Sequence, residues 1–177
     1  NIYAKHLASE SKRNYQKFSH TNIQLAGYMK TGNNLQWDAG VGMKRDLTYK
    51  YGYVPVTLVL PVDSLKQSFQ TISGRLAFHN INKTEFGLTY APELKIDIFS
   101  DNHKNSESNT VLNAPLQKTI GKAFAVNLGI TFDLTRFSPD NKSAVNNTMY
   151  FISPSVSYKS SAINAEVGIR PSWDNGK

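Results

Sequence analysis

Apolar and polar residues alternate along several long stretches of the chain. The most regular stretch runs from Phe86 to Ile98, where every even-numbered residue is apolar or proline. Successive side chains of a β-strand point to opposite faces, so this pattern predicts a strand with one apolar face. Its other face would carry Glu93, Lys95 and Asp97. No apolar repeat of 3.6 residues continues for three helical turns, so the chain is predicted to be almost entirely antiparallel β-structure.

The same alternation predicts eight strands in a single domain over residues 1–177, and residues 2–7 would add a ninth. The approximate ranges are 22–30, 35–44, 68–80, 86–98, 110–120, 124–135, 150–158 and 163–173. Short and long connections alternate between them. The short ones are 31–34, 81–84, 121–123 and 159–161, and the long ones are 47–67, 99–109 and 137–147.

A ladder of hairpins with short turns at one end and long loops at the other is typical of outer-membrane barrels. The Greek-key connections of a soluble sandwich would mix the two lengths at both ends. We therefore expect an all-β, antiparallel, up-and-down transmembrane β-barrel of at least eight strands. The turn-like residues 174–177 indicate that this chain is part of a larger barrel.

Alternation alone does not separate a membrane barrel from a soluble one such as a lipocalin, because both have one apolar face. Two details favour lipid. The predicted apolar face carries no charge except Lys118, which lies near a turn where its long stem could reach an interface. Aromatic residues also gather toward strand ends, as in the girdles of membrane barrels. They are Trp37, Phe78, Phe86, Phe124, Tyr150, Tyr158 and Trp173.

Composition and motifs exclude several classes of function. Cysteine is absent, which rules out disulfides and thiolate chemistry. The net charge of +7 is spread without a run of five basic residues, so nucleic-acid binding is not expected. The four histidines form no metal-binding spacing, and no nucleophile elbow or phosphate-binding loop is present. We expect no enzyme activity and no cofactor. No apolar segment has the length of a transmembrane helix or the place of a signal peptide.

Charged residues at polar positions of the strands are predicted to line the interior. These candidates are Asp38, Lys44, Arg75, Glu93, Lys95, Asp97, Asp133, Glu166 and Arg170. Two groups, Asp133 with Arg136 and Glu93 with its neighbours Lys95 and Asp97, are interpreted as cross-strand ion pairs inside the barrel rather than as acid or base catalysts.

Two other features qualify this picture. Pro92, Pro115, Pro154 and Pro171 fall inside predicted strands and each removes a backbone donor, so bulges or strand ends are expected near them. In the loop 47–67, Tyr49, Tyr51 and Tyr53 could stack on sugars or contact a partner, or else pack on neighbouring loops.

Three segments resemble parts of a known family. They are 110–122 (TVLNAPLQKTIGK), 153–156 (SPSV) and 171–177 (PSWDNGK). They are similar to segments of Bacteroidota outer-membrane β-barrel proteins that are often labelled TonB-dependent-receptor-like. The resemblance implies an internal piece of a larger barrel in the outer membrane. True TonB-dependent receptors also have a plug and an energy-coupling box, and neither is visible here.

Three functions follow as hypotheses. The first is an outer-membrane barrel that passes or imports a solute, with the lipid bilayer as its main partner. The second is a barrel subunit that holds other envelope proteins and transports nothing. The third is a soluble β-barrel that binds an apolar ligand inside.

Overall fold

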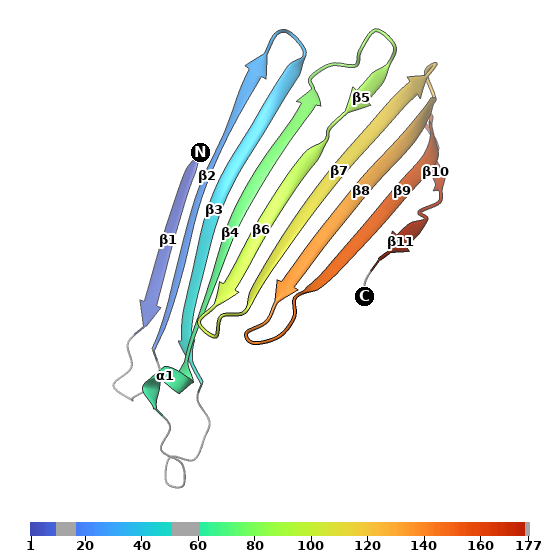
Figure 1. Ribbon diagram of the computed structural model, residues 1–177. Helices are drawn as coiled ribbons and strands as arrows, with labels where there is room; N and C mark the ends of the chain where they lie inside the picture. The colour runs from blue at the N-terminus through green and yellow to red at the C-terminus, as the bar shows by residue number, and fades with distance from the viewer. Residues whose placement is uncertain (10–16, 51–60, 176–177) are drawn as a thin grey trace.

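The computed structural model describes residues 1–9, 17–50 and 61–175, and about three quarters of them lie in one antiparallel β-sheet (Figure 1). The strands are β1 (Ile2–Ser9), β2 (Phe18–Thr31), β3 (Leu35–Tyr49), β4 (Lys66–Asn80), β5 (Leu88–Tyr90), β6 (Glu93–Asp101), β7 (Ser106–Ile120), β8 (Phe124–Ser138), β9 (Val145–Lys159), β10 (Asn164–Gly168) and β11 (Ser172–Asp174). A single helical turn, α1 (Val62–Leu65), precedes β4. No helix in the described part of the chain is long and apolar enough to cross a membrane.

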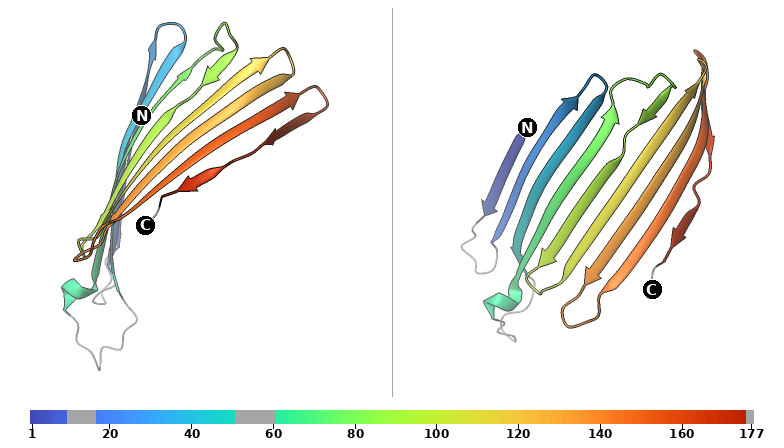
Figure 2. Two further views of the ribbon diagram at one scale, coloured as in Figure 1. Left: turned by 45° about the vertical axis from the view of Figure 1, so that its right-hand side comes forward. Right: turned by 45° about the horizontal axis from the view of Figure 1, so that its top comes forward.

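The strands follow one another in an up-and-down order. The sheet order is β1-β2-β3-β4-β6-β7-β8-β9-β10, with β5 paired to β7 and β11 paired to β9. Figure 2 shows a single curved, twisted layer, with the described residues at the two chain ends on opposite edges. The prediction of an antiparallel up-and-down all-β fold is confirmed. The sheet formed by the described residues is open rather than closed on itself.

The strand at residues 2–7 is confirmed as β1, which pairs with β2 from Ile2 to Ser9. The prediction of one continuous strand from Phe86 to Ile98 is wrong. Phe86 lies in a turn, and the segment is divided into β5 and β6 at residues 91–92. The strand predicted at 163–173 is likewise divided, into β10 and β11.

The strict alternation of short and long connections is also wrong. Much of 99–109 and nearly half of 137–147 belong to strands, which leaves turns at 102–105 and 139–144, whereas the connection at 81–87 is longer than predicted. Serine and asparagine are the commonest residues of these extensions, and backbone hydrogen bonds hold the extensions in the sheet without the apolar–polar alternation of the other strand segments. The loop predicted at 47–67 is shorter too, because β3 continues to Tyr49 and β4 begins at Lys66.

Two prolines explain the division between β5 and β6. The N–H of Ala91 donates to the carbonyl of Pro115 at 3.2 Å, and Pro115 has no N–H to return that bond. On the other side, the N–H of Phe78 donates to the carbonyl of Pro92 at 3.0 Å, again without a return bond. The ladder is therefore weakened on both sides of residues 91–92.

The same arrangement divides β10 from β11. Ile169 donates to Pro154 at 3.1 Å and Ile152 donates to Pro171 at 3.2 Å, each through a single backbone bond. The expected strand ends at Pro92 and Pro171 are confirmed. Bulges at Pro115 and Pro154 are not observed, since β7 and β9 keep unbroken register with β8. The nitrogens of Pro115 and Pro154, which carry no hydrogen, face the breaks between β5 and β6 and between β10 and β11.

The side chain of Asn80 joins β4 to β5 beyond this division. Its Nδ2 donates to the carbonyls of Asn82 and Leu88 at 2.7 and 2.9 Å, and its Oδ1 accepts the N–H of Tyr90 at 2.8 Å. Asn80 is only 5% exposed. A side-chain amide therefore replaces the backbone bonds that the β4 ladder lacks here.

No hydrophobic core covers the sheet in the described part of the chain. The buried apolar residues there are Leu65 and Ala77, and large apolar side chains such as Val41 (60% exposed) and Leu25 (51% exposed) remain open. A soluble monomer rarely exposes a contiguous apolar patch of more than a few hundred Å². The apolar face is therefore open in the described structure.

Candidate functional site: the two faces of the sheet

Strand register sorts the residues into two faces. Residues directly opposite one another share a face, so Gly40 lies on the same side as Ala26 and Arg75, and Arg75 on the same side as Lys95. We call this side the polar face. The opposite side, the apolar face, carries residues such as Val41 and Leu76.

The apolar face is a band with limits at both ends. On β8 it runs from Phe124 to Leu134 and is followed by Arg136 on the same face. On β4 it runs from Ile72 to Phe78, between Gln70 and Asn80. β2, β6, β7 and β9 follow the same pattern, and their outermost apolar residues at the end near α1 are Ile23, Ile98, Leu112 and Tyr150. On β3, Arg45 follows Met43 on this face, and Leu47 and Tyr49 lie beyond it.

Aromatic rings lie near both limits of this apolar band. At the end away from α1, Trp37 and Phe78 have ring centroids 4.9 Å apart, and Tyr90 lies 6.1 Å from Phe78. Phe124 and Tyr158 form a second pair at 4.9 Å. Nearer the other end, Phe132 meets Tyr150 edge-on at 5.7 Å, and Trp173 is the register partner of Tyr150. Of the predicted aromatic positions, Phe86 is the exception, since it lies in a turn.

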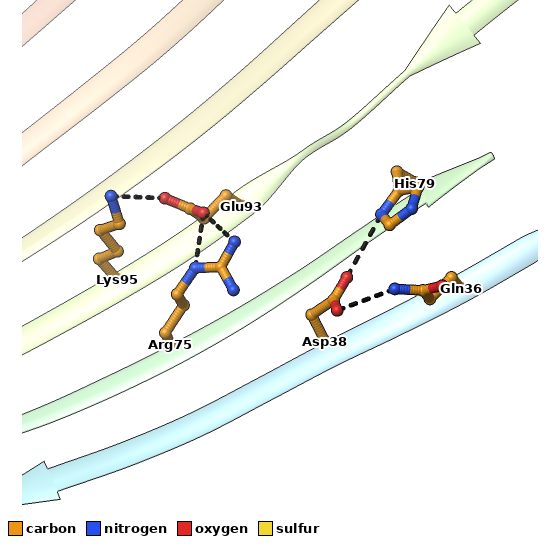
Figure 3. A network of polar contacts seen from close by, with 6 residues as sticks. All are labelled: Gln36, Asp38, Arg75, His79, Glu93 and Lys95. Atoms are coloured by element: carbon orange, nitrogen blue, oxygen red, sulfur yellow. Dashed lines mark hydrogen bonds and ion pairs between the residues drawn. The ribbon is translucent and has the colours of Figure 1, made fainter. Parts of the chain in front are cut away.

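The polar face holds a network of three charged residues on β4 and β6 (Figure 3). Glu93 accepts from Arg75 at 2.6 Å and from Lys95 at 2.7 Å. Arg75 and Lys95 are direct cross-strand partners, and two like charges in that position repel each other. The carboxylate of Glu93 offsets this repulsion, so the predicted cross-strand ion pairing of Glu93 is confirmed.

The same figure shows a second polar group on β3 and β4. Asp38 lies 3.3 Å from His79 and accepts from Gln36 at 3.0 Å. Asp97, the third member of the predicted charge group, accepts from Ser73 at 2.5 Å. Lys44 pairs with Asp46 at 3.2 Å.

The predicted pair of Asp133 with Arg136 is wrong. Asp133 lies on the polar face and accepts from Asn109 at 2.7 Å, whereas Arg136 lies on the apolar face. The odd spacing along one strand is the physical reason, because it places the two side chains on opposite sides. Glu166 accepts from Ser155 at 2.6 Å.

Arg170 is the one candidate that does not lie in a strand, since it falls between β10 and β11. Its guanidinium lies 4.7 Å from the ring centroid of Phe151. That distance is within the range of a cation–π contact. The other eight candidates share the polar face by register, as the alternation predicted.

Two hollows open on the polar face. The first, of about 410 Å³, has Gly40 and Gly42 on its floor and Lys44, Arg75 and Lys95 among its lining residues. A Cβ atom built on Gly40 or Gly42 would meet nothing nearer than 3.5 Å, so neither glycine is required by crowding. Their lack of a side chain keeps the hollow open. The second hollow, of about 480 Å³, lies over the Pro115 region and includes Glu166.

Asp101 organises the turn 102–105, beyond the limit of the apolar band. Its carboxylate accepts the N–H groups of His103 and Asn105 at 2.8 and 2.9 Å, and the side-chain amide of Asn105 at 2.8 Å. Partial burial alone would raise the pKa of Asp101. The hydrogen bonds from Asn105 and His103 outweigh it, so the pKa lies below its ordinary value.

Several contacts of the polar face involve residues that were not candidates. Asn109 and Asn127 bridge neighbouring strands, with Asn127 accepting from Gln117 at 2.8 Å. Alternation could have placed them on this face, but it could not name their partners. Of the tyrosines proposed for recognition, Tyr49 ends β3, and Tyr51 and Tyr53 lie outside the described residues.

The described residues contain no group of three or more His, Asp or Glu side chains that could hold a metal ion. No protein-family model and no curated protein sequence matches this chain.

Proposed function

We propose that the chain forms part of an outer-membrane β-barrel that passes a solute, with the apolar face against lipid and the polar face toward a water-filled interior. The protein would make and break no covalent bonds. The observation that carries the proposal is the apolar band, bounded by polar residues at both ends and edged with aromatic rings.

The dimensions of the band support lipid as the covering partner. On β8, Phe124 and Leu134 are ten residues apart (134 − 124), which at about 3.4 Å per residue and a tilt near 45° corresponds to a height of roughly 24 Å. Transmembrane barrels have an outer apolar band of about 25 Å. Ten residues at about 3.4 Å along nine strands spaced about 4.8 Å apart give the band an area of roughly 1,500 Å².

The distribution of charge supports a hydrated interior. Among the described strand residues, every Asp and Glu lies on the polar face, where most of them pair or accept hydrogen bonds. Both hollows also open on that face, with Gly40 and Gly42 leaving room beside Arg75 and Lys95.

The open edges indicate that more strands complete the barrel. β1 pairs only with β2, and β10 only with β9, among the described residues. Lipid cannot satisfy unpaired backbone groups, so membrane-spanning sheets must close. In this proposal the free edges pair with further strands of a larger barrel, as the resemblance to TonB-dependent-receptor-like proteins implies.

Reconstitution into lipid vesicles tests the proposal. The protein should partition into the bilayer and allow flux of small solutes. Replacing Arg75 and Lys95 by Gln should shift ion selectivity toward cations, because Glu93 then loses both partners. A matched control, Lys118→Gln, removes a cation from the apolar face and should leave selectivity unchanged.

Two outcomes would contradict it. A monomer that stays soluble in water without detergent would refute membrane insertion. A protein that inserts but conducts nothing would refute solute passage and would favour the second hypothesis, a barrel subunit that holds other envelope proteins.

A further inference from the structure

Positive charge collects at one limit of the apolar face. Arg45 follows Met43 on this face of β3, and Arg136 follows Leu134 on β8. Lys66 begins β4 on the same side, as the register partner of Tyr49. Arg45 and Arg136 are exposed and Lys66 is half-buried. We call Arg45, Lys66 and Arg136 the basic rim.

The basic rim has no counter-charge within the described protein. None of its three side chains forms an ion pair in the described part of the chain, whereas Arg75 and Lys95 on the polar face share Glu93. No Asp or Glu of the described strands lies on the apolar face. Within the described sheet, these three side chains are therefore available to an acidic partner from outside it.

Neutral hydrogen-bonding side chains continue the basic rim across the sheet. Gln70 is the register partner of Arg45, and Ser100 and Ser106 extend the same row. Ser108 stands opposite Arg136. Arg45 and Arg136 lie among hydroxyl and amide groups directly beside the apolar band, and Lys66 lies farther out on the same face. This arrangement matches the phosphate of a lipid whose chains lie on that band. Near the other limit, the band itself contains one cation, Lys118, opposite Val126.

We propose that the basic rim binds the phosphate-bearing headgroups of anionic lipids, so that the end of the sheet near α1 faces the more anionic lipid surface. This inference rests on the proposed function, because it requires the apolar face to lie in a bilayer. The inference adds to the proposed function the class of lipid that is bound and the orientation of the sheet in the membrane.

The two tryptophans of the chain allow a direct test. Trp173 lies toward the basic rim and Trp37 lies at the opposite limit, and both belong to the apolar face. In Trp37→Phe protein reconstituted into vesicles, Trp173, which shares a row with Phe132 of β8, reports lipids at the end of the band where Arg136 lies, through quenching by brominated phosphatidylglycerol or brominated phosphatidylcholine. We expect the anionic lipid to bind about fivefold more tightly at low salt, since one cation near a membrane surface contributes about 1 kcal/mol. The preference should fall as salt is raised.

Arg136→Gln should remove most of this preference at Trp173. Lys118→Gln is the matched control, because it removes a cation from the same face at the other limit and should leave the preference intact. A second pair uses neighbouring residues: Arg45→Gln should lower the number of anionic lipids retained in native mass spectrometry, whereas Lys44→Gln, on the polar face, should not.

The outcomes separate the two proposals. Equal quenching by both lipids, or a preference that survives Arg136→Gln, would overturn lipid selection by the basic rim and leave the barrel intact. No quenching by either lipid would refute membrane insertion itself.

Discussion

The side chain of Asn80 is predicted to be the largest single polar contribution to the stability of the sheet. It takes the place of the ladder where Pro92 interrupts pairing with β4, and it is almost fully buried. Asn80→Ala would leave the carbonyl of Asn82 without its side-chain donor and the N–H of Tyr90 without its acceptor, whereas the carbonyl of Leu88 would keep only the N–H of Thr84 at 3.0 Å.

The expected cost follows from the three hydrogen bonds, of 2.7, 2.9 and 2.8 Å. Each contributes about 1 kcal/mol net, and a buried group left unsatisfied costs more. Some of this is regained through side-chain freedom and local relaxation. We expect a loss of about 2–4 kcal/mol in the free energy of unfolding.

Urea unfolding of the reconstituted protein, followed by tryptophan fluorescence, measures this loss. Trp37 is a suitable reporter because it packs against Phe78, two residues before Asn80. With a urea dependence of about 2 kcal/mol per M, the midpoint should fall by about 1–2 M. Asn113→Ala is the control, since Asn113 is exposed and accepts one bond of 3.1 Å from Thr131, and it should change stability by less than about 0.5 kcal/mol. If Asn80→Ala costs no more than this control, the bridging role of Asn80 is wrong.

Three further predictions concern the hollow, the prolines and the turn at 102–105. Gly40→Leu should fill the first hollow and roughly halve solute flux, while the free energy of unfolding changes by less than about 1 kcal/mol. Unchanged flux would refute a solute path through this hollow. Pro154→Ala should be tolerated, because the nitrogen of Pro154 faces a strand end. Gly129→Pro, between two continuous ladders, should lower the free energy of unfolding in urea by at least about 2 kcal/mol. Equal losses for the two variants would contradict this explanation. Because the pKa of Asp101 is lowered in the folded protein, its carboxylate stabilises the folded turn fully above the ordinary carboxyl pKa. This stabilisation is lost as the pH falls through the pKa of the folded protein. Asp101→Asn should therefore flatten the pH dependence of hydrogen exchange in the turn below about pH 4, and an unchanged profile would oppose it.

Much of the candidate site could be predicted from residue order. Alternation of period two is a property of the extended backbone itself, so it assigned Asp38, Arg75 and Glu93 to one face without knowledge of their neighbours. The predicted pair of Asp133 and Arg136 failed because it disregarded this alternation, which places the two side chains on opposite faces. Loop lengths failed because polar strand extensions have no apolar contrast to reveal them.

By itself, the sequence determined the antiparallel all-β class, most of the strands and the faces on which their residues lie. Only the tertiary structure decided which strands run side by side, and hence that Glu93 forms ion pairs with both Arg75 and Lys95. It also decided that the nitrogens of Pro115 and Pro154 point at strand ends of their neighbours. The physical reason is that side-chain direction is set by local backbone geometry, whereas hydrogen-bond partners depend on register between segments far apart in the chain.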